Sequence, residues 1–138
     1  MQPEAPVPQS DSTVFVVDDD SAMRNSLRWL LESAGLHVET FANGEDFLAI
    51  CRPDGRGCVL LDVRMPGIDG LAVERLLHER RIPLPVIILT AHADAGTAAR
   101  ASALGALAFL KKPCDDTVLL ATVQHALATD RQRRPGQA

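Results

Sequence analysis

The sequence is poor in aromatic and basic residues. It has no tyrosine and one tryptophan, and aromatic residues make up 4% of its 138 positions, so platforms for base stacking are not expected. Lysine and arginine total 14 against 18 acidic residues, which gives a net charge of −4. This balance disfavours a nucleic-acid-binding surface on these residues.

Cysteines and long apolar runs are also scarce. Cys51, Cys58 and Cys114 show no CxxC spacing, which disfavours both zinc and a disulfide framework and favours small buried side chains in a reducing cytoplasm. No apolar stretch approaches the ~18 residues of a membrane span, so we expect no membrane contact. Residues 1–12 hold three prolines but neither an apolar core nor a basic start, and are predicted to be a disordered leader.

Five short apolar segments alternate with five segments of helical periodicity. Strands are predicted over residues 13–17, 36–41, 58–61, 86–89 and 106–110, and helices over 22–34, 43–50, 70–80, 94–104 and 116–127. The alternation predicts one α/β domain over residues 13–129, a parallel five-stranded sheet with helices on both faces. Residues 130–138 form a polar tail, predicted to be a solvated linker; a phosphate-binding arm is the alternative.

Polar residues stand where the predicted strands end. Asp18 and Asp19 follow the first strand and Asp62 the third; Thr90 ends the fourth and Lys112 follows the fifth. Ligands of open α/β sheets bind outside the carboxyl ends of strands, so these side chains should converge. Asp62 alone could merely end a strand, but two carboxylates ~4 Å apart repel by about 4 kcal/mol at a dielectric of ~20. The cluster therefore predicts a Mg²⁺ site, beside which an aspartate can attack a phosphoryl group.

Four motifs stand at the ends of predicted strands. In chain order they are Val16-Val17-Asp18-Asp19-Asp20, Leu61-Asp62-Val63-Arg64-Met65-Pro66-Gly67-Ile68-Asp69-Gly70, Leu89-Thr90-Ala91 and Phe109-Leu110-Lys111-Lys112-Pro113. Together they resemble the receiver domain of two-component response regulators. Their variable positions look most like those of FixJ/NarL-type regulators. The resemblance implies a flavodoxin-like (βα)5 fold, doubly wound, with strand order 2-1-3-4-5.

The resemblance also implies a role for each site residue. Asp62 would be the phospho-acceptor. Asp19, Asp18 and Asp62, with the backbone carbonyl of Arg64, would hold Mg²⁺, for which Mn²⁺ could substitute. Thr90 and Lys112 would bind phosphoryl oxygens, and the Lys112–Pro113 bond would be cis.

Further positions are implied to transmit the signal or to tune its lifetime. Thr90 and Phe109 would form the switch, although Phe109 could equally be an ordinary core residue. Arg64, Ala91 and His92 would flank the path of the hydrolytic water and tune the phosphate lifetime; His92 could instead be an exposed residue without a role.

The resemblance further implies partners. A sensor histidine kinase would supply the phosphoryl group, and phosphorylation would promote a homodimer through the fourth helix, fifth strand and fifth helix. DNA would be bound only by a C-terminal domain that these residues do not contain; a natural single-domain regulator is the alternative. Two rival functions remain: a haloacid-dehalogenase-like hydrolase, which would need an aspartate where Arg64 stands, and a degenerate receiver that only binds partners.

Overall fold

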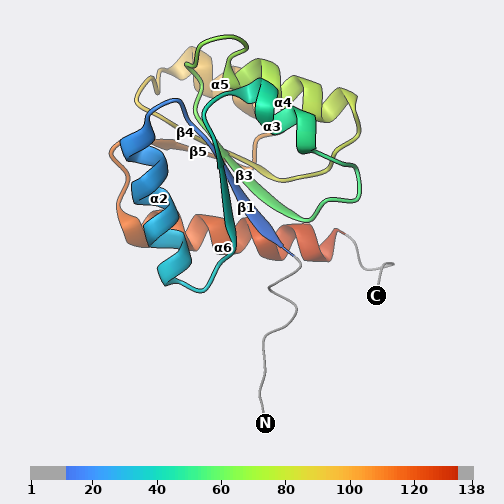
Figure 1. Cartoon of the computed structure of the whole chain (residues 1–138). Coiled ribbons are helices and arrows are strands. Elements are labelled where there is room, and N and C mark those ends of the chain that lie inside the picture. The colour runs from blue at the N-terminus through green and yellow to red at the C-terminus, as the bar shows by residue number, and fades with distance from the viewer. Residues whose placement is uncertain (1–11, 134–138) are drawn as a thin grey trace.

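The computed structural model describes residues 12–133, which form a sheet of five parallel strands between two layers of helices (Figure 1). The strands lie in the order β2-β1-β3-β4-β5. Along the chain the elements are β1 (Thr13–Val17), α2 (Ser21–Ser33), β2 (Val38–Phe41), α3 (Gly44–Ile50), β3 (Gly57–Leu61), α4 (Gly70–Glu79), β4 (Val86–Thr90), α5 (Ala95–Ala103), β5 (Ala108–Lys111) and α6 (Asp116–Gln132). The predicted α/β class, helix layers and strand order are confirmed.

Successive side chains of the central strands point to opposite faces of the sheet, which divides the core into two apolar layers. In β3, Cys58 and Leu60 face the layer formed with α2 and α6, whereas Val59 and Leu61 face the layer formed with α3, α4 and α5. All five β3 residues are buried, as expected for a strand covered on both faces. The central strands are therefore rigid supports for whatever follows their carboxyl ends.

Short polar residues begin the helices. Asp20, Asn43, Asp69, Asp94 and Asp115 each accept a backbone N–H of the first helical turn, which stabilises that end of the helix. The loops from β1 and β3 into their helices are consequently short and tightly defined. These two loops carry the predicted acidic residues.

Some predicted boundaries differ from the structure. Helix α6 runs to Gln132, so the domain does not end at residue 129 as predicted. Asp130, assigned to the polar tail, is 1% exposed and accepts a hydrogen bond from the Gly57 backbone N–H at 2.9 Å. It therefore anchors the start of β3. Except for Ser12, which is buried, the predicted leader lies outside the described residues, as do residues 134–138 of the predicted tail. Within residues 12–133, no helix has the length and hydropathy needed to cross a membrane.

Glu74 is an acid inside the core layer on α4. Its side chain is buried, and neither carboxylate oxygen has a hydrogen-bond partner among the described residues. Burial raises the pKa of Glu74 from 4.5 to about 7, because the charged form loses its hydration without compensation. The folded protein therefore holds this proton over a pH range in which the unfolded chain releases it.

Glu74 should make stability fall as pH rises. Between pH 4.5 and about 7 the unfolded state ionises first, so folding becomes less favourable by a total on the order of 3 kcal/mol. Glu74→Gln removes this dependence, and its advantage over the parent in free energy of unfolding should grow from pH 5 to pH 8 in urea titrations. Glu79→Gln, on the exposed side of α4, is the control. Parallel pH profiles for Glu74→Gln and the parent would contradict the assignment.

Candidate functional site

The register of β1 and β3 places two aspartates side by side. Val17 is paired with Leu61 at the ends of these parallel strands, so the residues that follow, Asp18 and Asp62, are also neighbours. The Asp62 backbone N–H donates to the Val17 carbonyl at 3.0 Å, which extends the ladder by one bond. The carboxylates therefore project from the carboxyl edge of the sheet, as the sequence predicts.

Asp18, Asp19 and Asp62 form a compact acidic cluster. Each offers one oxygen, and these three oxygens lie within 4.8 Å of one another. Asp18 and Asp62 are buried, at 3% and 8% exposure, whereas Asp19 is exposed and leaves the cluster open on one side. This donor set fits a hard divalent cation, because Mg²⁺ prefers a few carboxylate oxygens and keeps several waters.

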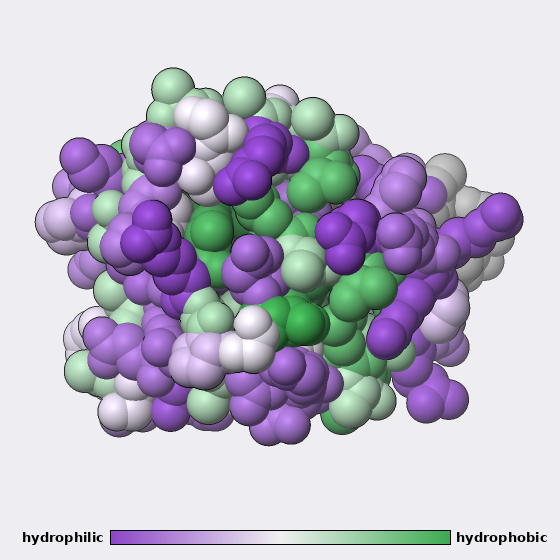
Figure 2. Space-filling model, turned by 90° about the horizontal axis from the view of Figure 1, so that it is seen from above, coloured by the Kyte–Doolittle hydropathy of each residue, from purple (hydrophilic) through white to green (hydrophobic). Residues whose placement is uncertain are grey.

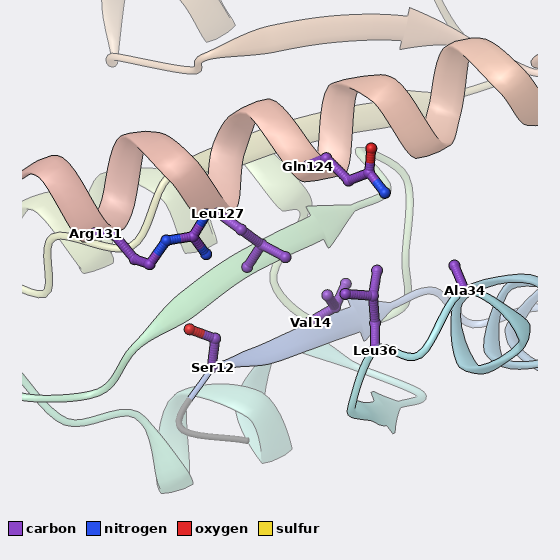
Figure 3. A pocket seen from close by; sticks show the side chains of 7 residues that line it. All are labelled: Ser12, Val14, Ala34, Leu36, Gln124, Leu127 and Arg131. Atoms are coloured by element: carbon purple, nitrogen blue, oxygen red, sulfur yellow. The ribbon is translucent and has the colours of Figure 1, made fainter. Parts of the chain in front are cut away.

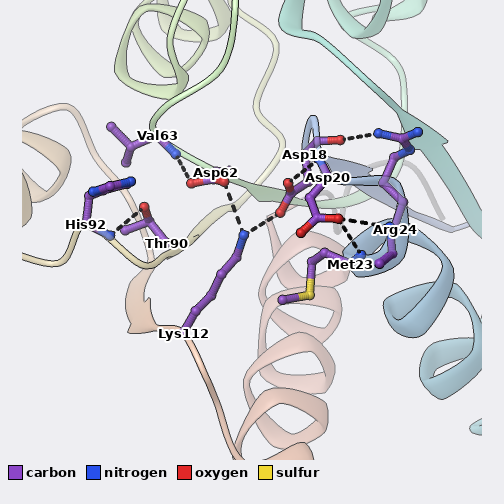
Figure 4. A network of polar contacts seen from close by, with 10 residues as sticks. Asp18, Asp20, Met23, Arg24, Asp62, Val63, Thr90, His92 and Lys112 are labelled. Carbon is purple, nitrogen blue, oxygen red and sulfur yellow. Dashed lines mark hydrogen bonds and ion pairs between the residues drawn. The ribbon is translucent and has the colours of Figure 1, made fainter.

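Lys112 supplies the positive charge inside the cluster. Its Nζ donates to Asp18 Oδ2 at 2.6 Å and to Asp62 Oδ2 at 3.1 Å, and thus bridges the ends of β1 and β3 (Figure 4). The Lys112 backbone N–H donates to the Thr90 carbonyl, which fixes the residue beside β4. One ammonium faces three carboxylates, so two negative charges remain unbalanced when all three acids are ionised.

Burial and the bonds to Lys112 together shift the pKa values of Asp18 and Lys112. Burial raises the pKa of Asp18, and the hydrogen bonds from Lys112 and from the Asp20 backbone N–H oppose this rise without cancelling it. For Lys112, burial acts to lower the pKa, but its bonds to Asp18 and Asp62 outweigh burial and raise it. The lysine is therefore held charged between the acids, while Asp18 would gain from a further cation.

The turn after Asp62 is closed by specific contacts. The Val63 N–H donates to Asp62 Oδ1 at 2.7 Å and orients the carboxylate. Gly70 opens α4 directly against the Asp62 backbone: a Cβ there would lie 2.1 Å from the Asp62 carbonyl oxygen. Glu45, at the start of α3, accepts the Ile68 N–H at 3.2 Å and ties this turn to its neighbour. The loop that carries Arg64 is thus held at both ends.

The remaining predicted residues lie around the same edge. Thr90 is fully buried, and its Oγ1 accepts the His92 N–H at 3.1 Å. Ala91 and His92, which follow it, are exposed, and so is Arg64 in the turn after Asp62. Phe109, in edge strand β5, is partly buried against the α3–α4–α5 core layer. The Lys112–Pro113 peptide bond is cis.

Two contacts of the site were not predicted from the sequence. The Arg24 guanidinium, one turn into α2, donates to the Asp18 carbonyl at 2.7 Å, and Glu45 braces the turn after Asp62. Both are charged residues near a helix start, and charge at such positions is ordinary on a protein surface. Only the tertiary arrangement distinguishes these two from other surface charges.

A separate cavity of about 240 Å³ lies at the opposite end of β1 (Figure 3). It is lined by Ser12, Val14, Ala34, Leu36, Gln124, Leu127 and Arg131. This lining contains no carboxylate, and Arg131 is its only ionisable group. The acidic cluster at the carboxyl edge is therefore the better candidate for chemistry.

Removal of Lys112 should destabilise the metal-free protein. Lys112→Met leaves three facing carboxylates and should lower the free energy of unfolding at pH 7 by about 2 kcal/mol, less than for a fully buried pair. The loss should shrink in acid, because protonation of Asp18 removes part of the repulsion between the carboxylates. Mg²⁺ should restore part of the lost stability. Lys111→Met, the exposed neighbour, is the control and should change little. Equal effects of both substitutions would show that the bridge contributes nothing.

Comparison with known proteins identifies the fold and the family. Residues 14–124 match the response regulator receiver domain family. The transcriptional regulatory proteins TdiR of Thauera aromatica and FixJ of Bradyrhizobium diazoefficiens are 47% and 42% identical, each over 88% of this chain. The chain spans only 53% and 58% of their lengths. Among solved structures, response regulator StyR matches with a TM-score of 0.86 and 41% sequence identity, and the match covers 92% of this chain and 64% of StyR. FixJ-N matches with a TM-score of 0.79 and 37% sequence identity, and that match covers 86% of this chain and 94% of FixJ-N. The chain belongs to the receiver domain family of two-component response regulators.

Proposed function

We propose that this receiver domain is a switch that accepts a phosphoryl group from a histidine kinase on Asp62 and then hydrolyses it. The observation that carries the proposal is the cluster of Asp18, Asp19 and Asp62, in which Lys112 bridges the two buried aspartates, Asp18 and Asp62. Receiver domains are not classical enzymes. Here the domain would catalyse only the phosphorylation and dephosphorylation of its own Asp62.

The chemistry is the transfer of one phosphoryl group. An Asp62 oxygen attacks phosphorus, the bond from phosphorus to the donor nitrogen breaks, and the donor imidazole keeps the electron pair. Mg²⁺, held by Asp18, Asp19, Asp62 and the Arg64 carbonyl, would neutralise charge on the phosphoryl oxygens; Mn²⁺ should substitute. Lys112 would bind one of these oxygens and Thr90 another through its hydroxyl, because phosphoryl transfer depends on positioning and electrostatics. Hydrolysis later returns Asp62 to the carboxylate.

The rival functions have less support. A phosphatase of the haloacid-dehalogenase kind would need an acid two residues after the nucleophile, where this chain has Arg64. A receiver that only binds partners would not need the acceptor, the acids and the lysine together, yet Asp62, Asp18, Asp19 and Lys112 converge here.

The signal would leave through α5, β5 and α6. Phosphorylation would draw the Thr90 hydroxyl toward Asp62, and Phe109 would turn into the vacated space. Helix α5 would resist displacement only weakly, because it consists mostly of small residues and a groove of about 410 Å³ separates it from α4. Figure 2 looks onto the layer of α3, α4 and α5, where hydrophobic side chains lie in hollows between hydrophilic ones. A local charge change would thus bias a weakly packed element, as other modification switches do.

The phosphodonor would approach over the groove between α2 and the start of α6. This groove is lined by Met23, Ser26, Leu27, Leu30, Leu89, Lys112, Pro113, Cys114, Asp116 and Leu119. Lys112 belongs both to the groove and to the acidic cluster, so a protein seated there lies next to Asp62. Apolar groups such as Met23 offer the adaptable contact that a protein partner needs.

The whole protein would control transcription from the cytoplasm. TdiR and FixJ are transcriptional regulatory proteins about twice as long as the matched region, so a C-terminal DNA-binding domain would follow residue 138. Phosphorylation would promote a homodimer through α5, β5 and α6. Residues 134–138 would begin the linker between the two domains.

Acetyl phosphate with Mg²⁺ tests the acceptor directly. The chain should gain the mass of one phosphoryl group, as read by intact mass spectrometry, and Asp62→Asn should gain none because the nucleophile is gone. Asp69→Asn, a helix cap in the same turn, is the control and should still be modified. Rapid turnover of many phosphomonoesters would favour the hydrolase, and absence of any modification would favour the degenerate receiver.

Arg64 and His92 should set the phosphate lifetime. Both side chains are exposed and would flank the path of the hydrolytic water, so Arg64→Ala or His92→Ala should admit water more freely and shorten the lifetime about two- to tenfold, up to ~1.4 kcal/mol in barrier. Release of inorganic phosphate from the purified phosphoprotein measures this. His125→Ala on α6 is the control. Unchanged phosphate lifetimes in both variants would contradict this prediction.

A charge in the groove beside Lys112 should block the kinase alone. Met23→Glu should slow transfer from a purified histidine kinase that phosphorylates the parent, by about tenfold or more, because it buries a charge in an apolar contact. Phosphorylation by acetyl phosphate should keep its rate. Ile50→Glu, exposed on α3 at the other face of the sheet, controls for added charge. An equal loss with both donors would place the damage in the acidic cluster instead.

A further inference from the structure

The acidic residues Asp18, Asp19 and Asp20 lie in a three-residue connection between β1 and α2. Asp20 caps α2 through its side chain, and Asp18 bonds to Lys112, whereas the Asp19 carboxylate is exposed at the open side of the cluster. An exposed side chain can hold a cation well only if its backbone is fixed, because ordering a free residue on binding costs entropy.

Asp18 makes three hydrogen bonds in addition to the one from Lys112. Its backbone N–H donates to the Phe41 carbonyl of β2 at 3.1 Å, its Oδ1 accepts the Asp20 N–H at 2.9 Å, and its carbonyl accepts Arg24 Nη1 at 2.7 Å. The third bond differs from the others because a helix side chain holds the carbonyl of the peptide that joins Asp18 to Asp19. A peptide unit is planar, so fixing its oxygen also fixes the N–Cα direction of Asp19.

We propose that Arg24 is a positioning residue for the metal site, one that orients the Asp18–Asp19 peptide so that the Asp19 carboxylate stays directed at the cation. Figure 4 shows its guanidinium reaching back from α2 to the end of β1. A bond from a charged donor suits this role, since such bonds are shorter and stronger than neutral ones. This inference rests on the proposed function, which supplies the cation.

Two effects of Arg24 on cation binding have opposite signs. As a nearby positive charge, Arg24 repels a divalent cation, so its removal should tighten binding. As the anchor of the Asp19 backbone it favours binding, so its removal should weaken it. The direction of the change in affinity therefore decides between bystander and positioning residue.

The experiment is Mn²⁺ binding to the whole chain by electron paramagnetic resonance, with no phosphodonor present. Arg24→Ala should bind Mn²⁺ about tenfold more weakly, the size expected for loss of one charge-assisted hydrogen bond. Arg24→Lys, which keeps the charge and a donor, should recover part of the affinity. Arg28→Ala removes the same charge one turn further along α2, where the side chain contacts Thr40, and should bind as tightly as the parent or more so.

A metal-free measurement separates positioning from loss of fold. In ¹H–¹⁵N spectra, Arg24→Ala should shift or broaden the amides of Asp19 and Asp20 and leave those of β3 in place. Arg24→Ala binding Mn²⁺ as tightly as the parent would overturn this inference alone, and so would general loss of dispersed amide signals. A parent chain that binds no Mn²⁺ would overturn the proposed metal site and this inference together.

Discussion

The repulsion among three carboxylates at the carboxyl edge of the sheet is the interaction on which the rest depends. Asp18, Asp19 and Asp62 bring ligand oxygens within 4.8 Å, and Lys112 offsets only part of their charge. A surface of free side chains would relax by moving the acids apart. Here the strand register and the bonded loops oppose that movement, and this is the physical basis on which we propose a cation site at this edge.

The elements around this cluster differ in how tightly they are packed. The central strands β1 and β3 are buried on both sides and hold Asp18 and Asp62 in place. At the other side of Thr90, α5 is made of small residues and borders the groove against α4. In the proposed function, a change of charge at Asp62 would act on fixed neighbours at one side and on this helix of small residues at the other. This asymmetry is what a switch requires, because the change must move something without dispersing through the core.

Sequence patterns predicted which polar residues lie at the carboxyl edge of the sheet better than the contacts that support them. Asp18, Asp62, Thr90 and Lys112 could be found because parallel strands end at one edge, so position along the chain fixes position in space. Arg24 and Glu45 act through bonds to backbone groups of other segments, which no spacing rule reveals. Asp130 was assigned to the tail because it is polar, yet a long-range bond to Gly57 buries it. Glu74 sits in an apolar helix stripe, where an unpaired acid contradicts the pattern instead of following it.

Thermal unfolding against Mg²⁺ concentration tests the central claim most directly. If the cluster is organised around unbalanced negative charge, Mg²⁺ should raise the melting temperature of the unphosphorylated chain in a saturable way, because a ligand that binds only the folded state stabilises it by mass action. Asp19→Asn, which removes one ligand but leaves the Lys112 bridge in place, should lose most of this rise. A melting temperature that Mg²⁺ leaves unchanged in the parent, or raises equally in both proteins, would contradict the claim.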